Sequence, residues 1–267
     1  MASPGDLTVR SGRVKTARRL ATRSFRAKTG EFLAEGPQAV REALDAESEA
    51  GQSVVIEVFA TVDATQRYPE LADRSDAWHV VTDDVVEEIA DSVTPQGLVA
   101  RCHSVLTTLD EVPQDARLVV VCAEIRDPGN LGAVIRCADA AGAAAVVVAG
   151  DSVDPLNPKV VRATAGSLFH LPIAVERDVE AVIAELQRRG SQVLAADGGG
   201  ETSLFDADLD LTVPTAWMMG NEAHGLAPDW AQAADRVVHV PILGRAESLN
   251  LATAAAVCLY ASAREQR

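Results

Sequence analysis

Three short stretches of the chain combine glycine with polar side chains in a pattern that can hold a ligand. They are RDPGNLGAVIR at 126–136, MGNEAHGL at 219–226 and GRAESLN at 244–250. Each follows an apolar run that predicts a strand. Because open parallel sheets bind ligands at the carboxyl ends of their strands, we expect the three stretches to form one site.

Five polar residues of these stretches are candidates for chemical roles, namely Asn130, Arg136, Glu222, Ser248 and Asn250. Taken singly, each has a simpler explanation. Asn130 and Ser248 suit turns and helix caps, while Glu222 suits a solvated loop. Arg136 suits an exposed helix face. The sequence is equally consistent with His224 having a role in the site and with His224 having none. The conjunction of three such loops favours a site, but spacing alone predicts no particular reaction.

Several common chemistries lack their motifs in this chain. Residues 129–132 give only G-x-x-G, and DGGGE at 197–201 has neither the dinucleotide-binding spacing nor a following helix signal. There is no P-loop sequence and no G-x-S-x-G elbow. The histidines show no metal-ligand spacing, so we expect no metal site; they are His79, His103, His170, His224 and His239.

Charge is distributed unevenly along the chain. The 267 residues carry a formal net charge of -15, which argues against a general nucleic-acid coat. The first 30 residues, however, contain a single acid, Asp6, and the basic residues Arg10, Arg13, Lys15, Arg18, Arg19, Arg23, Arg26 and Lys28. Spacings of three and four residues from Lys15 to Arg26 would give one basic face if the segment is helical. The alternative is a solvated or disordered basic tail.

The remaining composition predicts a soluble, cytoplasmic protein with no membrane association. No apolar run approaches the length of a membrane-spanning helix, and the N-terminus has no secretory apolar region. The four cysteines form no C-x-x-C pair, so we expect buried thiols in a reducing compartment; they are Cys102, Cys122, Cys137 and Cys258.

Hydrophobic periodicity predicts an α/β protein of two domains. After a basic arm at 1–30, alternating strands and helices indicate a small α/β domain at 31–105. Residues 106–116 lack hydrophobic periodicity, which predicts a linker. The βα alternation over 117–267, starting from the continuous apolar strand LVVVCAEI, indicates a doubly wound parallel sheet.

The motifs DPGNLGAVIRCADAAGA, MMGNEAHGL and VPILGRAESLNLATAAAVCLY resemble, in the same order, those of the SpoU/TrmH branch of the SPOUT RNA methyltransferases. The N-terminal stretch RVKTARRLATRSFRAKTGEFLAEGPQAVREAL resembles the substrate-binding domain that often precedes that catalytic domain. The resemblance covers nearly the whole chain. It implies a trefoil knot in the C-terminal domain, a homodimer, and transfer of a methyl group from S-adenosylmethionine to a ribose 2'-hydroxyl of RNA.

When the positions of the family's motifs are matched to this sequence, the resemblance implies that five residues contact the cofactor: Met219, Gly220, Val240, Ile242 and Leu249. A guanidinium stays protonated, so we expect Arg136 to bind a phosphate and polarise the hydroxyl, either in the active site of its own chain or in that of the partner subunit. Asn130 and Glu222 are assigned to loop architecture and substrate orientation, and Ser248 and Asn250 to the cofactor loop and target ribose.

Three readings of the function remain open at this point. The resemblance of the N-terminal domain favours ribosomal RNA as substrate over transfer RNA. The rival from a different class is a non-catalytic RNA-binding or assembly protein that keeps the knotted fold. RNA contacts are assigned to the basic arm, through Arg13, Lys15, Arg18, Arg19, Arg23, Arg26 and Lys28.

Overall fold

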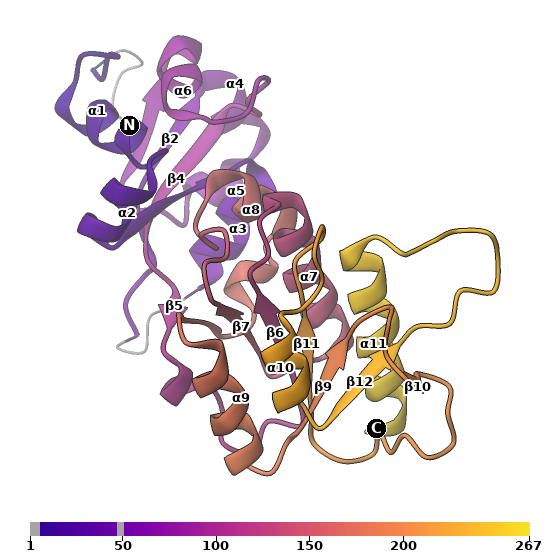
Figure 1. Ribbon diagram of the computed structural model, residues 1–267. Coiled ribbons are helices and arrows are strands. Elements are labelled where there is room, and N and C mark those ends of the chain that lie inside the picture. The colour runs from indigo at the N-terminus through magenta and orange to yellow at the C-terminus, as the bar shows by residue number, and fades with distance from the viewer. Residues whose placement is uncertain (1–5, 47–50) are drawn as a thin grey trace. The chain divides into compact units, whose positions relative to one another are not determined.

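The computed structural model describes residues 6–46 and 51–267 and divides the chain into two compact units (Figure 1). The first unit is formed from Met1–Val105 and Leu156–His170, and the second from Leu106–Pro155 and Leu171–Arg267. Both are built from strands and helices, so the α/β class that the periodicity predicts is confirmed.

The first unit is built on a four-stranded sheet. Its strand order is β1-β4-β2-β3, with β4 antiparallel to β1 and to β2, and β2 parallel to β3. Its elements are α1 Gly12–Arg19, α2 Arg23–Thr29, β1 Glu31–Glu35, α3 Pro37–Asp45, β2 Val55–Thr61, α4 Val62–Arg67, α5 Pro69–Ala72, β3 Trp78–Val81, α6 Asp83–Ile89, β4 Leu98–His103, α8 Pro158–Thr164 and the 3-10 turn Ser167–Phe169.

The segment expected to be a basic arm is part of the first unit's core. Val14, Ala17 and Leu20 are fully buried and pack with side chains of α6 and of the sheet, including Phe59 and Ile89. The segment is helical and forms two short helices, α1 and α2. The apolar residues at every third position of α1 direct that helix onto the sheet, and basic periodicity did not reveal this.

Residues 156–170 belong to the first unit, although the expected boundaries place them in the second. Arg162 of α8 donates to Glu35 at 2.9 Å and to Asp91 at 2.8 Å. Phe169 stacks on Phe32 with ring centroids 6.0 Å apart. Because Glu35 and Phe32 lie on β1, these ionic and aromatic contacts bind the segment to the four-stranded sheet, and the chain crosses between the units at three points.

The second unit contains an entirely parallel eight-stranded sheet. Its strand order is β10-β12-β9-β11-β6-β7-β8-β5, so β6 lies in the interior, as its continuous apolar sequence predicts. The elements are β5 Leu106–Thr107, the 3-10 turn Leu109–Glu111, β6 Leu118–Ala123, α7 Pro128–Ala141, β7 Ala145–Ala149, β8 Ile173–Glu176, α9 Val179–Arg188, β9 Gln192–Ala196, β10 Thr202–Ser203, β11 Thr215–Met219, α10 Pro228–Ala233, β12 Arg236–His239 and α11 Leu251–Glu265.

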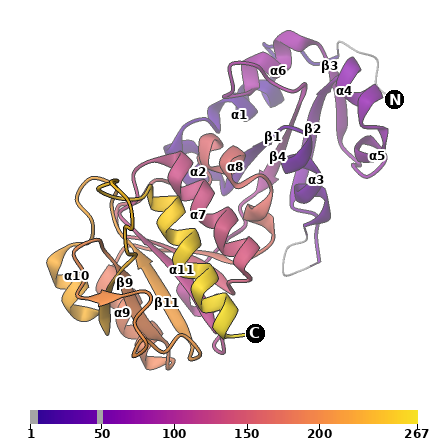
Figure 2. The ribbon, with the colours of Figure 1, turned by 90° about the vertical axis from the view of Figure 1, so that its right-hand side faces the viewer.

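Helices cover both faces of this sheet. Helices α7 and α11 lie side by side on one face, as Figure 2 shows, and α9 packs against the other. Trp217 of β11 is fully buried, and its indole nitrogen donates to the Ser262 hydroxyl of α11 at 2.9 Å. This hydrogen bond fixes the last helix on the sheet, which places the start of α11 at the carboxyl ends of the strands.

The residues expected to form a linker, 106–116, belong to the second unit. Leu106 and Thr107 pair with β8 as the short edge strand β5, and Val112 is buried in the core. Arg189, after α9, donates to the backbone oxygens of Val112 and Leu109. Individual contacts hold this segment in the second unit, and such contacts leave no periodic pattern of hydrophobic residues in the sequence.

All four cysteines are free thiols; Cys102, Cys122 and Cys258 are buried, and Cys137 is partly exposed. Burial raises the pKa of the Cys258 thiol to about 12, so it is protonated and unreactive at neutral pH. None of the helices in the described ranges is long and apolar enough to span a membrane.

Candidate active site

A cavity of about 860 Å³ opens where strands β9, β11 and β12 end and helices α7 and α11 begin. This is the carboxyl edge of the parallel sheet, where loops converge for topological reasons. All three glycine-containing stretches reach it. Its walls include Asn130, Asp197, Met219, Gly220, Asn221, Glu222, His224, Val240, Ile242, Ser248, Leu249 and Asn250.

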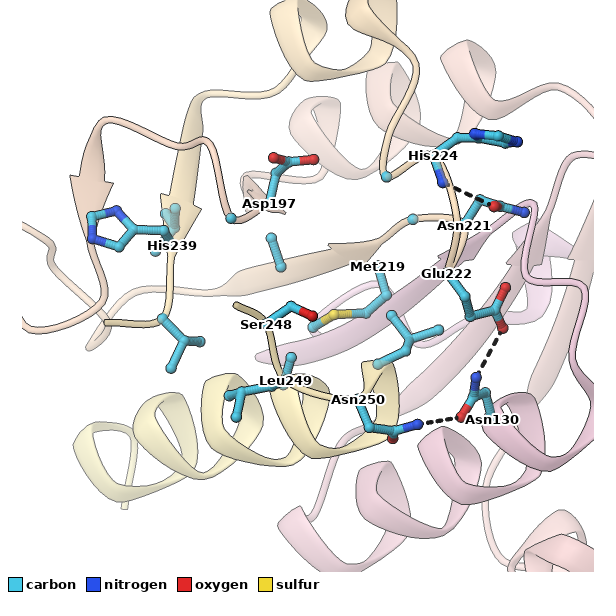
Figure 3. A pocket seen from close by; sticks show the side chains of 18 of the residues that line it. Asn130, Asp197, Met219, Asn221, Glu222, His224, His239, Ser248, Leu249 and Asn250 are labelled. Atoms are coloured by element: carbon cyan, nitrogen blue, oxygen red, sulfur yellow. Dashed lines mark hydrogen bonds between the residues drawn. The ribbon is translucent and has the colours of Figure 1, made fainter. Parts of the chain in front are cut away.

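Every residue expected to contact the cofactor lines this cavity. Met219 and Gly220 come from the end of β11, and Val240 and Ile242 from the segment after β12. Leu249 precedes α11, and Figure 3 shows it with Met219 around the same space. The cavity therefore combines apolar side chains with the backbone of two loops.

A chain of hydrogen bonds joins the three stretches across one side of the cavity (Figure 3). The Asn130 amide nitrogen donates to Glu222 at 3.2 Å, and the Asn250 amide nitrogen donates to the Asn130 oxygen at 3.0 Å. The Asn250 oxygen accepts from the backbone of Ala252 at 2.9 Å and so caps α11. The candidate residues thus serve as turn and cap residues while also holding one another in place.

Glu222 gathers backbone donors from the first stretch as well as the Asn130 side chain. Its two oxygens accept from the backbone N–H groups of Arg126 at 3.4 Å and Asp127 at 3.3 Å. Asp127 in turn caps α7 by accepting from the Asn130 backbone at 2.8 Å. A carboxylate held by three donors is a fixed part of the loop.

Gly220 lies where two parts of the second loop meet. A Cβ at this position would lie 2.6 Å from the carbonyl carbon of Gly225 and 2.7 Å from the Leu226 backbone nitrogen. Gly225 itself has a φ of +67°, a conformation that glycine adopts without strain. The loop can therefore close against the cavity only with glycine at both positions.

The hydroxyl of Ser248 is available for a ligand. Ser248 lines the cavity, as does Met219 (Figure 3), and the Ser248 side chain has no hydrogen-bond partner among the described residues. An unengaged hydroxyl can donate to or accept from a bound molecule.

Arg136 is the one expected catalytic residue that the structure places outside the cavity. It lies exposed on α7, six residues beyond Asn130. At 3.6 residues per turn, this spacing rotates its side chain to a different face of the helix. Within a single chain, the site therefore contains Asn130, Glu222, Ser248 and Asn250, and lacks Arg136.

Sequence reasoning missed several cavity residues, among them Asp197, Gly198 and His239. Asp197 and Gly198 belong to the DGGGE stretch, which does not fit a dinucleotide motif. Its position directly after a predicted strand was the signal that could have placed it at the site. Asp197 lies so close to Gly225 that a Cβ on this glycine would be 2.6 Å from the Asp197 oxygen.

The donor set of the cavity suits a positively charged organic ligand. Among its described lining residues are the carboxylates Asp197, Glu222 and Glu247 but no lysine or arginine. Together with apolar Met219 and Leu249, these groups favour a cation with an extended, partly apolar body. Over the described ranges, no cluster of histidine, cysteine and acidic side chains could hold a metal ion.

The basic residues of the first unit have divergent roles. Arg26 is only 4% exposed and donates to the backbone oxygens of Leu20 at 2.8 Å and Ala21 at 3.0 Å. Its assignment to RNA binding is therefore wrong, because its guanidinium caps the end of α1 inside the fold.

Two other basic residues of the segment are paired with acids, Arg13 with Glu57 and Arg18 with Glu88, and Arg19 lies over the Phe25 ring. Of the seven residues assigned to RNA, Lys15, Arg23 and Lys28 are exposed and have neither an ion pair nor a ring contact among the described residues.

We expect Arg26→Ala to lower the free energy of unfolding by about 2–3 kcal/mol, because the buried bond to the Leu20 oxygen and the partly buried bond to the Ala21 oxygen are both lost. Chemical denaturation followed by circular dichroism measures this change. Lys28→Ala, on the exposed side of α2, is the matched control and should change stability by less than about 0.5 kcal/mol. Equal stability of the two variants would contradict the structural role of Arg26.

Comparison with known protein families identifies both units. Residues 117–260 match the model of the SpoU rRNA Methylase family, and residues 12–100 match the MRM3-like substrate binding domain. The 23S rRNA (guanosine(2553)-2'-O)-methyltransferase RlmP of Bacillus subtilis is 32% identical over 95% of this chain and 96% of its own length. A 23S rRNA (uridine(2479)-2'-O)-methyltransferase of Streptomyces viridochromogenes is 35% identical over 68% of this chain and 66% of its own length.

Solved structures give the same relationship. The AdoMet-bound rRNA methyltransferase from Sinorhizobium meliloti superposes with a TM-score of 0.82 and 32% identity, covering 96% of each chain. The SpoU methyltransferase AviRb of Streptomyces viridochromogenes, in complex with the cofactor AdoMet, gives a TM-score of 0.81 and 30% identity over 96% of this chain and 98% of its own. The three motifs, the shared cavity and these similarities show that the chain belongs to the SpoU rRNA methylase family.

Proposed function

We propose that this protein transfers the methyl group of S-adenosylmethionine to a ribose 2'-hydroxyl of ribosomal RNA. The observation that carries the proposal is the meeting of all three family motifs in one cavity, with every expected cofactor contact in its wall. The similar enzymes whose names specify 2'-O-methylation of 23S rRNA support the reaction and the class of RNA.

The residues of the cavity would hold S-adenosylmethionine through apolar contacts, backbone groups and a carboxylate that is complementary to the positive charge of the cofactor. Met219, Ile242 and Leu249 offer apolar contacts, the Gly220 loop offers backbone groups, and Asp197 offers a carboxylate to the amino group. When bound, the cofactor supplies a methyl group made electrophilic by its positively charged sulfur. No metal is needed for this chemistry.

In the reaction, the 2'-oxygen forms a bond to the methyl carbon as the carbon–sulfur bond breaks, and sulfur keeps the electron pair of that bond. The hydroxyl proton leaves to a neighbouring phosphate oxygen or to water. The protein must orient the 2'-hydroxyl. The Asn130 and Asn250 amides and the Ser248 hydroxyl lie in the cavity wall, where they can form hydrogen bonds to the ribose. Arg136 is assigned to bind a phosphate of the substrate and to polarise the hydroxyl.

A homodimer accounts for the position of Arg136. On one chain, the residue faces away from the cavity, from an exposed face of α7 beside α11. Tyr260 of α11 is 52% exposed on these paired helices, and its hydroxyl donates to the Ala140 backbone oxygen of α7 at 3.2 Å. We place the dimer contact on this helix pair, with Arg136 completing the partner's site. The strand order of the second unit is compatible with the trefoil knot of the family.

The first unit is proposed to bind the RNA through the basic residues that remain free at its surface. We expect combined substitution of Lys15, Arg23 and Lys28 by alanine to raise the KM for RNA by about tenfold or more at physiological salt, because each phosphate contact releases counterions. The affinity for S-adenosylmethionine should be unchanged. Measuring KM at several salt concentrations checks this, since the slope of log KM against log salt should become shallower.

Deleting residues 1–30 is not a suitable substitute for these substitutions, because Val14, Ala17 and Leu20 belong to the core of the first unit. The control for the triple variant replaces basic residues already paired with acids, such as Arg67 and Arg74. An equal rise in KM for both variants would contradict the proposed RNA surface.

The rival function is a non-catalytic RNA-binding or assembly protein. Incubation of the purified protein with radiolabelled S-adenosylmethionine and unmodified ribosomal or transfer RNA distinguishes the two. We expect label in ribosomal RNA, at the 2'-oxygen, and none in transfer RNA. If cofactor binds but label enters neither RNA nor ribosome-assembly intermediates, the binding-protein function is favoured. Because its substrate is ribosomal RNA, we place the enzyme in the cytoplasm.

A further inference from the structure

A second cavity, of about 710 Å³, adjoins the cofactor cavity within the second unit. Asn130, Glu222 and His224 line both cavities, so the loop that follows β11 forms the wall between them. Glu124, Arg126 and Trp230 line only the second cavity, which we call the base pocket. We propose that the base pocket takes the base of the nucleotide that is methylated and selects guanine; this inference rests on the proposed function.

The position of the base pocket follows from the structure of a nucleoside. A 2'-hydroxyl aligned with the cofactor must lie near Asn130, on the shared wall, and the base is joined directly to the same ribose. A base splayed out of a single-stranded loop, the form in which RNA sequence is usually recognised, would then enter a space next to the cofactor cavity. Within the second unit, the base pocket is an adjoining cavity large enough for a nucleoside.

The walls of the base pocket offer the two kinds of contact that unstacked bases use. Trp230, from helix α10, presents a half-buried indole ring for stacking. Arg126 is positioned by Asp151, to which it donates at 2.7 Å, and its guanidinium can donate further bonds to a base carbonyl or ring nitrogen. An aromatic face and an oriented donor together match a nucleobase better than they match a phosphate.

Glu124 is the acidic residue of the base pocket that remains free to accept hydrogen bonds. The other two acids are engaged, since Glu222 binds Asn130 and loop N–H groups and Asp127 caps α7. Among the described residues, the Glu124 carboxylate has no hydrogen-bond donor, and its ionic neighbour Arg126 is 4.0 Å away. Asn221 donates to the Glu124 backbone oxygen at 3.0 Å and so fixes the residue at the pocket wall.

A free carboxylate favours guanine over the other bases. It presents two acceptor oxygens side by side, and guanine presents two adjacent donors, N1–H and the 2-amino group. Uracil offers one N–H between two carbonyl oxygens, which the carboxylate repels. Adenine and cytosine place an acceptor nitrogen next to their amino group. The complementary Arg126 donor would meet the guanine O6 or N7.

The first test identifies the methylated nucleoside. Transcribed ribosomal RNA is incubated with radiolabelled S-adenosylmethionine and digested to nucleosides, and we expect the label in 2'-O-methylguanosine. Label in another nucleoside overturns the guanine assignment, whereas the proposed methyltransferase function stands.

The second test is a set of variants. Glu124→Gln should lower kcat/KM for RNA by about 10- to 100-fold, because the amide opposes one guanine N–H with its own donor. Binding of S-adenosylmethionine should be unaffected. Inosine lacks the 2-amino group of guanosine. Replacing guanosine by inosine in the RNA should therefore lower the activity of the wild type. The same replacement should lower the already reduced activity of Glu124→Gln only slightly. Glu180→Gln, exposed on α9, is the matched control. A wild-type rate for Glu124→Gln on guanosine overturns the base pocket.

A binding measurement separates this inference from the proposed function. Guanosine and uridine 5'-monophosphates are titrated into the full chain in the presence of S-adenosylhomocysteine, and we expect guanosine monophosphate to bind at least about tenfold tighter. The difference should vanish in Glu124→Gln. Selective binding without methylation would refute the methyltransferase function alone. Methylation without this selectivity would refute the base pocket alone.

Discussion

Replacing Arg136 with alanine is expected to lower kcat by about 10²- to 10³-fold, the usual effect of losing a donor that stabilises developing charge. The dissociation constant of S-adenosylmethionine should change by less than about twofold, since Arg136 lies outside the cofactor cavity. Single-turnover methylation and calorimetric titration measure the two quantities. Arg188→Ala, at an exposed position on α9, is the matched control. An equal loss of turnover and cofactor affinity would argue against the assigned role.

A mixing experiment determines whether Arg136 acts in its own chain or across the dimer. Arg136→Ala subunits are mixed with Gly220→Ala subunits, at a concentration of S-adenosylmethionine that saturates wild-type sites but leaves the weakened Gly220→Ala sites empty. If Arg136 serves the partner's site, each mixed dimer contains one complete site, and random pairing restores about a quarter of wild-type activity. If it serves its own site, mixing restores none, and the dimer proposal for this residue fails.

Replacing Gly220 with alanine is expected to weaken binding of S-adenosylmethionine by about 100-fold. The added Cβ would lie 2.6 to 2.7 Å from backbone atoms of Gly225 and Leu226, and backbone cannot yield as a flexible side chain does. The loop after β11 must therefore move, which displaces the cavity wall. Calorimetric titration measures the affinity, and thermal unfolding reports whether the fold survives.

Gly198→Ala is the matched control for this substitution. Gly198 lines the same cavity, but a Cβ there would meet no atom within 4 Å. We expect its cofactor affinity to stay within about threefold of wild type. Similar affinities of the two variants would mean that close approach of the backbone at Gly220 does not shape the cofactor cavity.

The position of the site, though not its reaction, could be predicted from the sequence because the site residues are local to strand ends. Each motif follows an apolar run, and strand ends of a parallel sheet converge whatever the details of packing. This reasoning brought Asn130, Glu222, Ser248 and Asn250 to one site, and the structure places all four in the cavity wall. Their hydrogen-bond chain was not predictable, since it depends on distances between loops that are far apart in sequence.

What the sequence could not indicate was the direction in which each polar or basic side chain points after packing. Residues Arg26 and Arg136 have the same charge and similar helical surroundings in the sequence, yet one is buried as a backbone cap and the other is exposed. Periodicity identifies an apolar face, but it does not say which element covers that face.

The sequence by itself determined the α/β class, the interior position of β6 and the three loops of the site. These depend on local features, namely runs of β-branched residues, glycine turns and helix caps. Only the tertiary structure decided that residues 156–170 join the first unit, that Asp197 lines the cavity and that Arg136 does not. Those outcomes depend on contacts between residues distant in the chain, such as Arg162 with Glu35, which local patterns do not encode.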